Sequence, residues 1–427
     1  MTAEIDNQRD PAPGVDEGWM FPRIWSVCLV VLLAVTYRLW LPQSEMPLVP
    51  LLPGIQSLVT APALSWILTS LLAASLLINI AAKKCLAWSW GLTVATLIGL
   101  IVCDQQRLQP WAYQSMIYAF VFSMVGYKHC RRFVLMIAIS VYVFSAAGKF
   151  DFQFTHTVGI DLLQTLLSPI GLDISKWDIE TQAKLTLLMP LVELAAGLFL
   201  IPRRTRPVAG GVLIGMHLSL LFVLGPFGLG HSLGVLVWNV ALLLQALMLF
   251  VIPGIMDPRD NRKLYHRLFG RHEHNRVRRV PWVATNFVVA TALLMPLTER
   301  HGHWDHWLSW ALYSPHNSRV DLEVHESVIQ HLDAGLQQHA KSAENQSGWQ
   351  QVSLHNWSLS ARSVPLYPQS RYQLALVRAI MQNADLDRQV RCRSRGVADR
   401  WTGRRADKWL MGRQEIDKAL KGFKLIP

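Results

Sequence analysis

Residues 133–154 read FVLMIAISVYVFSAAGKFDFQF and decide the fold class. The stretch begins with thirteen apolar residues and two serines, and Lys149 and Asp151 then follow within an aromatic run. An apolar helix of about 20 residues is long enough to span the roughly 30 Å hydrocarbon core of a bilayer. The stretch therefore predicts a transmembrane helix that ends in two ionisable side chains.

In this chain of 427 residues, long apolar runs recur throughout residues 24–298. Hydrophobic residues make up 51% of the sequence and charged residues only 16%, whereas soluble proteins carry about 25% charged residues. The polar, acidic first twenty residues lack the basic segment of a cleaved signal peptide. Residues 299–427 have the composition of a soluble domain. We therefore expect an all-α polytopic membrane helix bundle followed by a small C-terminal α+β domain.

Nine segments are long and apolar enough to cross a membrane. They lie near 23–40, 61–82, 85–103, 110–127, 132–149, 183–201, 207–225, 232–252 and 281–298. Lysine and arginine gather in every second connection, while the other connections hold only Arg107 and Lys176. Because cytoplasmic loops are enriched in these cations, we expect a cell-membrane protein with a cytoplasmic N-terminus and an extracytoplasmic C-terminus.

The expected domain organisation has four parts. These are a cytoplasmic tail (1–22), the helix bundle (23–298), an interfacial linker rich in aromatic residues and histidine (299–318) and an extracytoplasmic α+β domain (319–427). In the last part, alternating patterns predict strands over 319–327 and 349–361 and a hairpin over 389–412. Helices are expected over 328–340, 370–384 and 415–423. The arginines of 388–405 fit a solvated strand face, or alternatively a surface that docks on anionic lipid headgroups.

The linker allows two interpretations. His301, His303 and His306 could converge on a metal ion, but Trp304, Trp307, Trp310 and Tyr313 fit an aromatic belt at a membrane interface. The belt explains more of the residues, so no metal site is predicted. The five cysteines are never spaced as CxxC, which also gives no basis for a zinc or dithiol site.

Ionisable groups in apolar helices cost about 2.5 kcal/mol or more each, so each one needs a reason. We take Lys149, Glu193 and His217 as candidate catalytic residues. Arg38, Arg107 and Asn239 are candidates for binding a cofactor. Snorkelling to the interface is the structural alternative for Arg38 and Lys149, and a satisfied internal pair is the alternative for Glu193.

Spacing predicts how some of these groups lie. Glu193 and His217 are about equally far from the turn PRRTRP (202–207), so we expect them to be neighbours that face the bundle interior. Tyr142, Ser145 and Lys149 fall near one helical face, which favours a Lys149 side chain directed inward. Together these residues predict a polar cavity that opens outward. Gly211 and Gly215, spaced as GxxxG, are expected to allow close approach of a neighbouring helix.

Four motifs carry a resemblance to a known family. VYVFSAAGKFDF (141–152), ELAAGLFL (193–200), MHLSLLF (216–222) and GHSLGVLVWNV (230–240) resemble the membrane domain of the vitamin K-dependent γ-carboxylase-like family, the HTTM domain. DoxX-like membrane proteins are more loosely similar. The resemblance implies that Lys149 matches the base that deprotonates vitamin K hydroquinone, and that His217 matches a histidine of a later helix. The family has adjacent lysines where this chain has Gly148, and it has a much larger lumenal portion, so the resemblance favours the fold and a quinone-like pocket over carboxylation.

Two classes of function follow from these residues. The first is a membrane enzyme in which a desolvated Lys149 acts as a base on a lipid- or quinone-like molecule that enters from the bilayer. The alternative is a non-catalytic scaffold or partner-binding subunit whose polar groups satisfy one another. A transporter is a third class, but the sequence has no inverted repeat that would indicate one. The expected partners are membrane lipids and a quinone-like ligand; no protein partner is identifiable, and no nucleic acid is expected.

Overall fold

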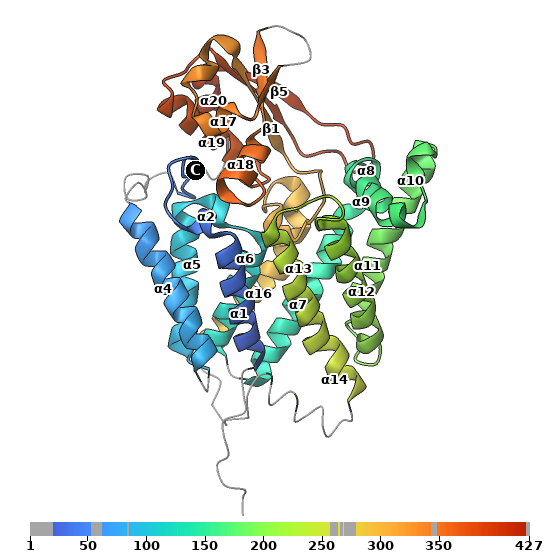
Figure 1. The fold of residues 1–427 in the computed structure, drawn as a ribbon. Coiled ribbons are helices and arrows are strands. Elements are labelled where there is room, and N and C mark those ends of the chain that lie inside the picture. Colours follow the sequence, from blue (N-terminus) through green and yellow to red (C-terminus); the bar gives the residue numbers. More distant parts are fainter. Residues whose placement is uncertain are drawn as a thin grey trace, which may run out of the picture.

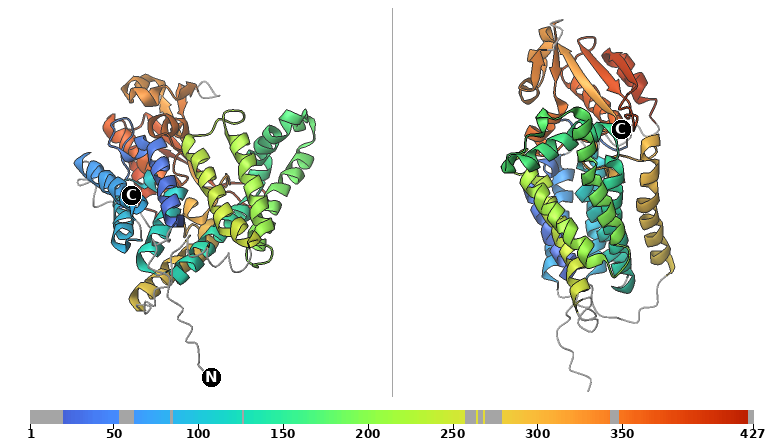
Figure 2. Two further views of the ribbon diagram at one scale, coloured as in Figure 1. Left: turned by 60° about the horizontal axis from the view of Figure 1, so that its bottom comes forward. Right: turned by 90° about the vertical axis from the view of Figure 1, so that its right-hand side faces the viewer.

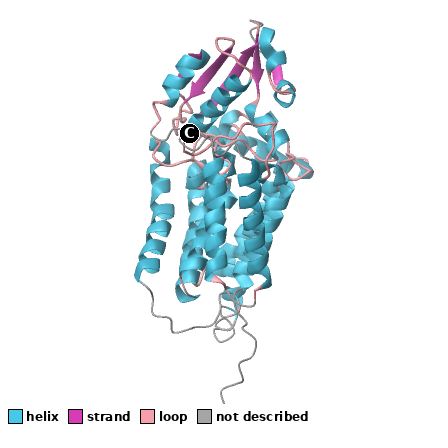
Figure 3. Ribbon diagram, turned by 90° about the vertical axis from the view of Figure 1, so that its left-hand side faces the viewer, coloured by secondary structure: helices cyan, strands magenta, loops and turns pink. Residues whose placement is uncertain are grey.

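The computed structural model describes residues 20–52, 62–82, 85–125, 127–256, Leu264, Leu268, 279–342 and 348–423. Long helices stand side by side beneath a smaller α+β domain formed by the C-terminal part of the chain (Figure 1, Figure 3). The first described helix begins at the end of the bundle that lies farthest from this domain (Figure 1). Most of the predicted cytoplasmic tail and the basic loops at 83–84 and 257–263 lie outside the described residues.

A helix occurs in each of the nine predicted segments. These helices are α1 (Met20–Val35) with α2 (Tyr37–Trp40), α4 (Pro62–Ala81), α5 (Ala87–Cys103), α6 (Pro110–Met124), α7 (Tyr127–Lys149), α10 (Ile179–Thr186) with α11 (Leu188–Phe199), α12 (Arg206–Leu224), α13 (Leu233–Ala246) with α14 (Ile252–Ile255), and α16 (Arg279–Leu294). Among the described residues, six stretches are long and apolar enough to cross a membrane, namely Pro62–Ala81, His129–Lys149, Ile179–Phe199, Arg206–Leu224, Leu233–Ile255 and Arg279–His301. These six stretches are compatible with a multi-pass membrane protein, whereas α1, α5 and α6 are shorter.

Prolines account for two interruptions of the long helices. Pro190 lacks the N–H that would bond to the carbonyl of Thr186, and α10 gives way to α11 beside it, at Leu187. Similarly, a π-helical turn (Leu247–Val251) separates α13 from α14, whose second residue is Pro253. The last long helix, α16, stands at the edge of the bundle (Figure 2), where it contacts α6 and α7.

The predicted loop 150–182 contains helices of its own. α8 (Phe152–His156) and α9 (Val158–Leu167) form at the end of the bundle nearest the C-terminal domain (Figure 1), together with the start of α10. Asp151 and Asp178 begin two of these helices, since their carboxylates accept hydrogen bonds from the backbone N–H groups of Gln153 and Thr181. The segment 150–182 has no membrane-length apolar run and was therefore expected to be a loop. Its capping aspartates are the sequence signal that indicates these short helices.

The C-terminal domain is built on a five-stranded antiparallel sheet in the order β2-β3-β1-β4-β5. The strands are β1 (Arg319–His325), β2 (Ala340–Ser342), β3 (Trp349–Val352), β4 (Val390–Arg395) and β5 (Asp407–Met411). In the central strand every second residue is buried, with Leu322 opposite both Val352 and Cys392. The helix α19 (Ser370–Asn383) packs on β1 and β4 and also contacts α20 (Gly412–Leu420).

The strand over 319–327, the hairpin and the last two helices are thus confirmed. The prediction of a strand through residues 353–361 is wrong, because Ser353 accepts a hydrogen bond from the N–H of Asn356 and begins α18 (Leu354–Arg362). The helix expected over 328–340 is reduced to a 3₁₀ turn (Glu326–His331) and one α-turn, α17 (Ala334–Gln337). On β4, Arg391 pairs with Glu323 at 2.6 Å, as expected for an ion-paired, solvated strand face.

Polar contacts fix this domain on the bundle. Gln106, in the 3₁₀ turn Gln105–Arg107, donates to the Ser358 hydroxyl at 2.9 Å and accepts from the Tyr367 N–H at 2.9 Å. Arg362, fully buried, reaches the carbonyl oxygen of Met46 at 2.9 Å and the carboxylate of Asp104 at 3.6 Å. The loop between 150 and 182 is tied to the same domain by a bond of 2.8 Å from the Phe152 N–H to the Arg400 carbonyl.

Candidate functional site

A cavity of about 320 Å³ lies between α7, α9, α11, α12 and α13. Its lining is mainly apolar, but a row of polar side chains interrupts it. These are Tyr142, Ser145, Lys149, Glu193, His217, Ser219, Asn239 and Tyr313. Ligand pockets typically measure about 300–1,000 Å³ and combine apolar walls with a few placed polar groups. The cavity therefore has the size and lining of a small-molecule site.

The central polar feature is a buried ion pair between Lys149 and Glu193. Lys149 is the last residue of α7, and its Nζ lies 2.6 Å from Oε2 of Glu193 on α11. The same Nζ donates to the Ser145 hydroxyl, one turn earlier, at 2.8 Å. An ammonium has three N–H donors, and the described residues supply these two acceptors. The third donor remains available to a molecule in the cavity.

The helical face predicted for α7 is confirmed. Tyr142, Ser145 and Lys149 all line the cavity, and Lys149 is only 7% exposed. The snorkelling alternative for Lys149 is therefore wrong. Asp151, two residues further on, points elsewhere and pairs with Arg300 at 2.8 Å.

His217 lies in a hydrogen-bonded chain that fixes its tautomer. The side-chain amide of Asn239 donates to the Val235 carbonyl at 2.9 Å, so its Oδ1 faces His217. Nδ1 of His217 lies 3.1 Å from this oxygen and must donate to it. Nε2, 3.1 Å from the Tyr142 hydroxyl, then accepts the phenolic proton. In the neutral form of His217 the ring proton therefore lies on Nδ1.

The linker and α9 line the cavity at the end nearest the C-terminal domain. Leu312 and Tyr313 contribute from the linker, and Leu162 contributes from α9. Tyr313 has a left-handed backbone conformation (φ 58°), which is unusual for a tyrosine. Burial raises the pKa of its phenol, so the hydroxyl enters the site protonated. The expected cavity was polar and open outward; the observed one is mainly apolar and bounded at this end by linker and α9 side chains.

Gly148 allows the linker to come this close. A Cβ atom at Gly148 would lie 3.0 Å from the Ser314 hydroxyl and 3.6 Å from the Cβ of Ala311. Any side chain in this place would therefore require the linker to move by a few tenths of an ångström.

The structure brings four of the six predicted site residues together. Lys149, Glu193, His217 and Asn239 all line the cavity. Glu193 and His217, expected to be neighbours that face the bundle interior, are both buried and line the same cavity. Their polar partners differ, because Glu193 pairs with Lys149 of α7 whereas His217 bonds to Tyr142 and Asn239. Depth along a hairpin fixes the level of a residue but not the helix toward which its side chain turns. The predicted GxxxG contact is wrong within the described part of the chain, since added Cβ atoms at 211 and 215 would meet no described atom within 4 Å.

The other two predicted site residues, Arg38 and Arg107, lie away from the cavity. Arg107 is fully buried and donates to the carbonyls of Leu39 and Trp40 at 3.1 and 3.3 Å, to the carbonyl of Leu100 and to the Ser65 hydroxyl. Arg38 is exposed and donates to the Ser360 carbonyl of α18 at 2.9 Å. Both therefore join structural elements instead of forming the cavity.

A buried polar network that the sequence did not predict lies beside the cavity. Gln114 of α6 bonds to Gln245 at 3.0 Å and accepts from the Trp238 indole at 3.2 Å, and the Tyr118 hydroxyl also bonds to Gln245. Trp238 at the same time lines the cavity. The available signal was a pair of glutamines in apolar helices, which are uncharged and so attracted less attention than the ionisable groups.

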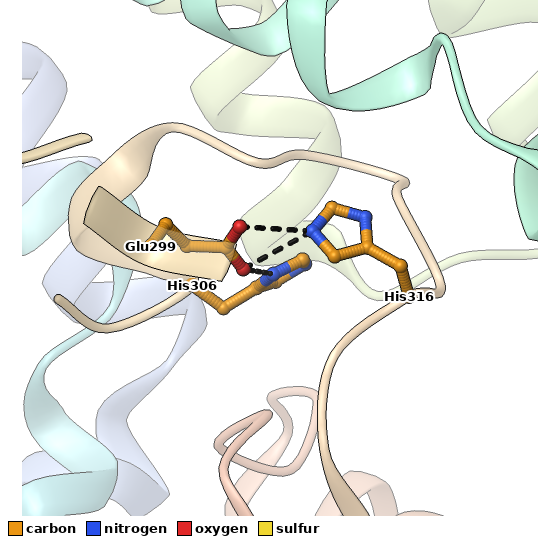
Figure 4. Close-up of side chains that lie close together, drawn as sticks. All are labelled: Glu299, His306 and His316. Atoms are coloured by element: carbon orange, nitrogen blue, oxygen red, sulfur yellow. Dashed lines mark hydrogen bonds and ion pairs between the residues drawn. The ribbon is translucent and has the colours of Figure 1, made fainter. Parts of the chain in front are cut away.

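A second polar cluster lies in the linker (Figure 4). Nδ1 of His306 is 2.9 Å from Oε1 of Glu299, and Nε2 of His316 is 3.1 Å from both oxygens of the same carboxylate. Burial lowers the pKa of His316. His301 and His303, which the sequence grouped with His306, are exposed.

The aromatic belt does not form as expected. Trp310 is fully buried against Tyr113, and Trp307 packs edge-on against Tyr367 of the C-terminal domain. These two rings fill the junction between the bundle and the domain instead of facing a membrane interface.

Comparisons with protein-family models, with curated proteins and with solved structures give no match for this chain. The chemistry of the site therefore has to be argued from its geometry. The cavity offers a ligand a cationic N–H donor, a carboxylate, a phenol–imidazole pair and an extended apolar wall.

Proposed function

We propose that this protein is a membrane enzyme that binds a lipid- or quinone-like molecule in the α7–α11–α12 cavity and transfers a proton at an oxygen of that molecule. The observation that carries the proposal is the Lys149–Glu193 ion pair, which is more than nine-tenths buried yet lines a mainly apolar cavity. Buried charges are costly and are retained at functional sites more often than elsewhere.

The walls of the cavity favour a ligand that arrives from the bilayer. Leu188 and Val192 on α11 and Val212 on α12 line it and are 55%, 52% and 42% exposed. Exposed aliphatic side chains on membrane-length helices face lipid without cost. An apolar molecule can therefore pass between α11 and α12 and leave its tail along them.

The polar row would act on the head group. The free N–H of the Lys149 ammonium can bond to a ligand oxygen and stabilise negative charge on it. The Glu193 carboxylate is close enough to accept the proton that a ligand hydroxyl releases, so the O–H bond breaks and an O–H bond to Glu193 forms. Lys149 then acts as the partner of a base, which differs from the isolated lysine base suggested by the γ-carboxylase-like resemblance.

We also propose the topology of nine spans, with the N-terminus in the cytoplasm and the C-terminal domain outside the cell membrane. The alternation of lysine and arginine between successive connections supports it. A reporter that is active only in the cytoplasm, fused after Pro427, is expected to be silent. A strong signal from this fusion would refute the topology.

The ligand itself is tested by mass spectrometry of protein purified in mild detergent. We expect a quinone or a defined lipid to accompany the wild type and to be lost from Lys149→Ala. Lys184→Ala is the matched control, because Lys184 forms an exposed pair with Glu180 at 3.6 Å. Equal retention by all three proteins would favour the non-catalytic scaffold, in which Lys149 and Glu193 merely satisfy each other.

A further inference from the structure

The linker cluster of Glu299, His306 and His316 has the composition and spacing of a metal site. One ligand atom from each residue lies within 4.8 Å of the other two, and all three residues are buried. They come from three separate places: a 3₁₀ helix (Met295–His301) that continues α16, the residue before the 3₁₀ turn Trp307–Ser309, and a turn that precedes β1. The chain therefore has to fold back twice to bring them together (Figure 4).

We propose that Glu299, His306 and His316 bind one divalent first-row transition-metal ion, with Zn²⁺ as the reference ion. Two imidazoles and one carboxylate are a ligand set found in protein zinc sites and in sites for related metals. His306 would bind through Nδ1 and His316 through Nε2, the atoms that already face the carboxylate. A water molecule or the second Glu299 oxygen would supply the fourth ligand.

The geometry needs little change to accept the ion. Bonds of about 2.0–2.1 Å in a tetrahedral site place neighbouring ligand atoms about 3.3 Å apart. The present separations of 2.9 and 3.1 Å from His306 and His316 to Glu299 are only a few tenths of an ångström shorter. The two histidine nitrogens lie within 4.8 Å of each other. Movement of the two rings that brings all three separations to about 3.3 Å would replace the hydrogen bonds with metal bonds.

Neighbouring residues hold the three ligands in place and do not compete for their ligand atoms. Arg300, next to Glu299, is directed at Asp151, so its charge has a partner of its own. Arg405 donates to the His316 carbonyl at 3.3 Å and thereby fixes the backbone of that ligand. Nδ1 of His316 has no hydrogen-bond partner within the described part of the chain. The ring proton can therefore stay on Nδ1, which leaves Nε2 unprotonated and able to bind the metal.

The metal would have a positioning role. Leu312 and Tyr313, which line the cavity, lie between His306 and His316 in the sequence. An ion at the cluster would therefore clamp both ends of this segment to α16 and hold Tyr313 at the cavity. This inference stands on the linker residues alone and does not depend on which ligand the cavity binds.

The test measures bound metal in the full-length protein in detergent. Protein stripped with a chelator and dialysed against Zn²⁺ is expected to hold about one equivalent by elemental analysis, and Zn²⁺ is expected to raise its unfolding temperature. Glu299→Gln retains a hydrogen-bonding side chain of the same shape, and it should bind Zn²⁺ at least about 100-fold more weakly. His301→Ala and His303→Ala remove exposed histidines of the same linker and should bind normally.

Two results would overturn the proposal. One is wild-type protein that holds no more Zn²⁺ than Glu299→Gln, which would leave the cluster as a hydrogen-bonded carboxylate. The other is loss of Zn²⁺ in His303→Ala with retention in Glu299→Gln, which would indicate surface binding. Because variants can fail to fold, Co²⁺ loaded into the wild type provides a second readout: the intense visible absorption of a tetrahedral site is expected, and its absence would contradict the proposal.

Discussion

The Lys149–Glu193 pair makes a quantitative prediction about stability. At a separation of 2.6 Å the Coulomb attraction is about 6 kcal/mol at an effective dielectric constant of 20. Part of this is offset by the cost of desolvating both charges, and removal of one partner from a buried pair typically costs about 3–5 kcal/mol. We therefore expect Glu193→Ala and Lys149→Ala each to destabilise the protein by about 3 kcal/mol or more.

The double variant separates the pair from its surroundings. Each single change leaves an unpaired buried charge, whose desolvation is no longer compensated. The double variant Lys149→Ala/Glu193→Ala leaves no such charge, so it should be destabilised by clearly less than the sum of the two single changes. A coupling free energy of about 2–3 kcal/mol is expected. The exposed Lys184–Glu180 pair, at 3.6 Å and with both side chains at least 75% exposed, should give no more than about 0.5 kcal/mol.

The assay is reversible unfolding in mixed detergent micelles, followed by tryptophan fluorescence, for the four proteins of each cycle. Ser145→Ala provides an internal scale, because single hydrogen bonds in membrane proteins contribute about 0.6 kcal/mol on average. A Lys149–Glu193 coupling no larger than that of the exposed pair would show that the two charges do not meet in the folded protein, and the proposed site would then lose its basis.

Two further predictions concern residues that hold structural elements together. Arg107→Met should destabilise the protein by about 3 kcal/mol or more, because it leaves buried carbonyls without a donor. Arg38→Met, at an exposed position, should change stability by no more than about 0.5 kcal/mol. Equal effects of the two changes in thermal unfolding would contradict the structural role of Arg107. Gly148→Ala should lower stability by about 1 kcal/mol and increase proteolysis of the linker, because the new methyl group meets Ser314 at 3.0 Å. Gly91→Ala, whose new Cβ would have no atom of the described residues within 4 Å, should be neutral or stabilising by up to about 1 kcal/mol. Similar behaviour of the two glycine variants would show that the linker does not pack on α7.

The sequence predicted which polar side chains face the bundle interior better than it predicted their hydrogen-bond and ion-pair partners. Lys149, Glu193 and His217 had to face inward because charge is costly in hydrocarbon, and in the structure they do. Their partners depend on helix rotation and on which helices are neighbours, and neither follows from hydropathy. For this reason depth matching indicated that Glu193 and His217 are neighbours, but it did not indicate that Glu193 pairs with Lys149 across α7 and α11.

The C-terminal domain shows the same division between local and long-range information. β1 and α19 follow from clear periodicity, whereas the end of the predicted strand 349–361 is the helix α18, with Ser353 as a cap that the alternating pattern concealed. The metal cluster escaped prediction because Glu299 and His316 are seventeen residues apart. Only the folding of the linker over the bundle brings them to His306.

The most direct test of the central claim is to locate the ligand. Membranes that contain the protein would be treated with a photoreactive quinone analogue, and the labelled peptides would be identified by mass spectrometry with and without excess unlabelled quinone. We predict competable labelling on α11 and α12, at cavity residues such as Met189, Val192 and Met216, and strongly reduced labelling in Lys149→Ala. Labelling that is not competed, or that falls on lipid-facing residues of α4, would contradict the cavity as the site of action.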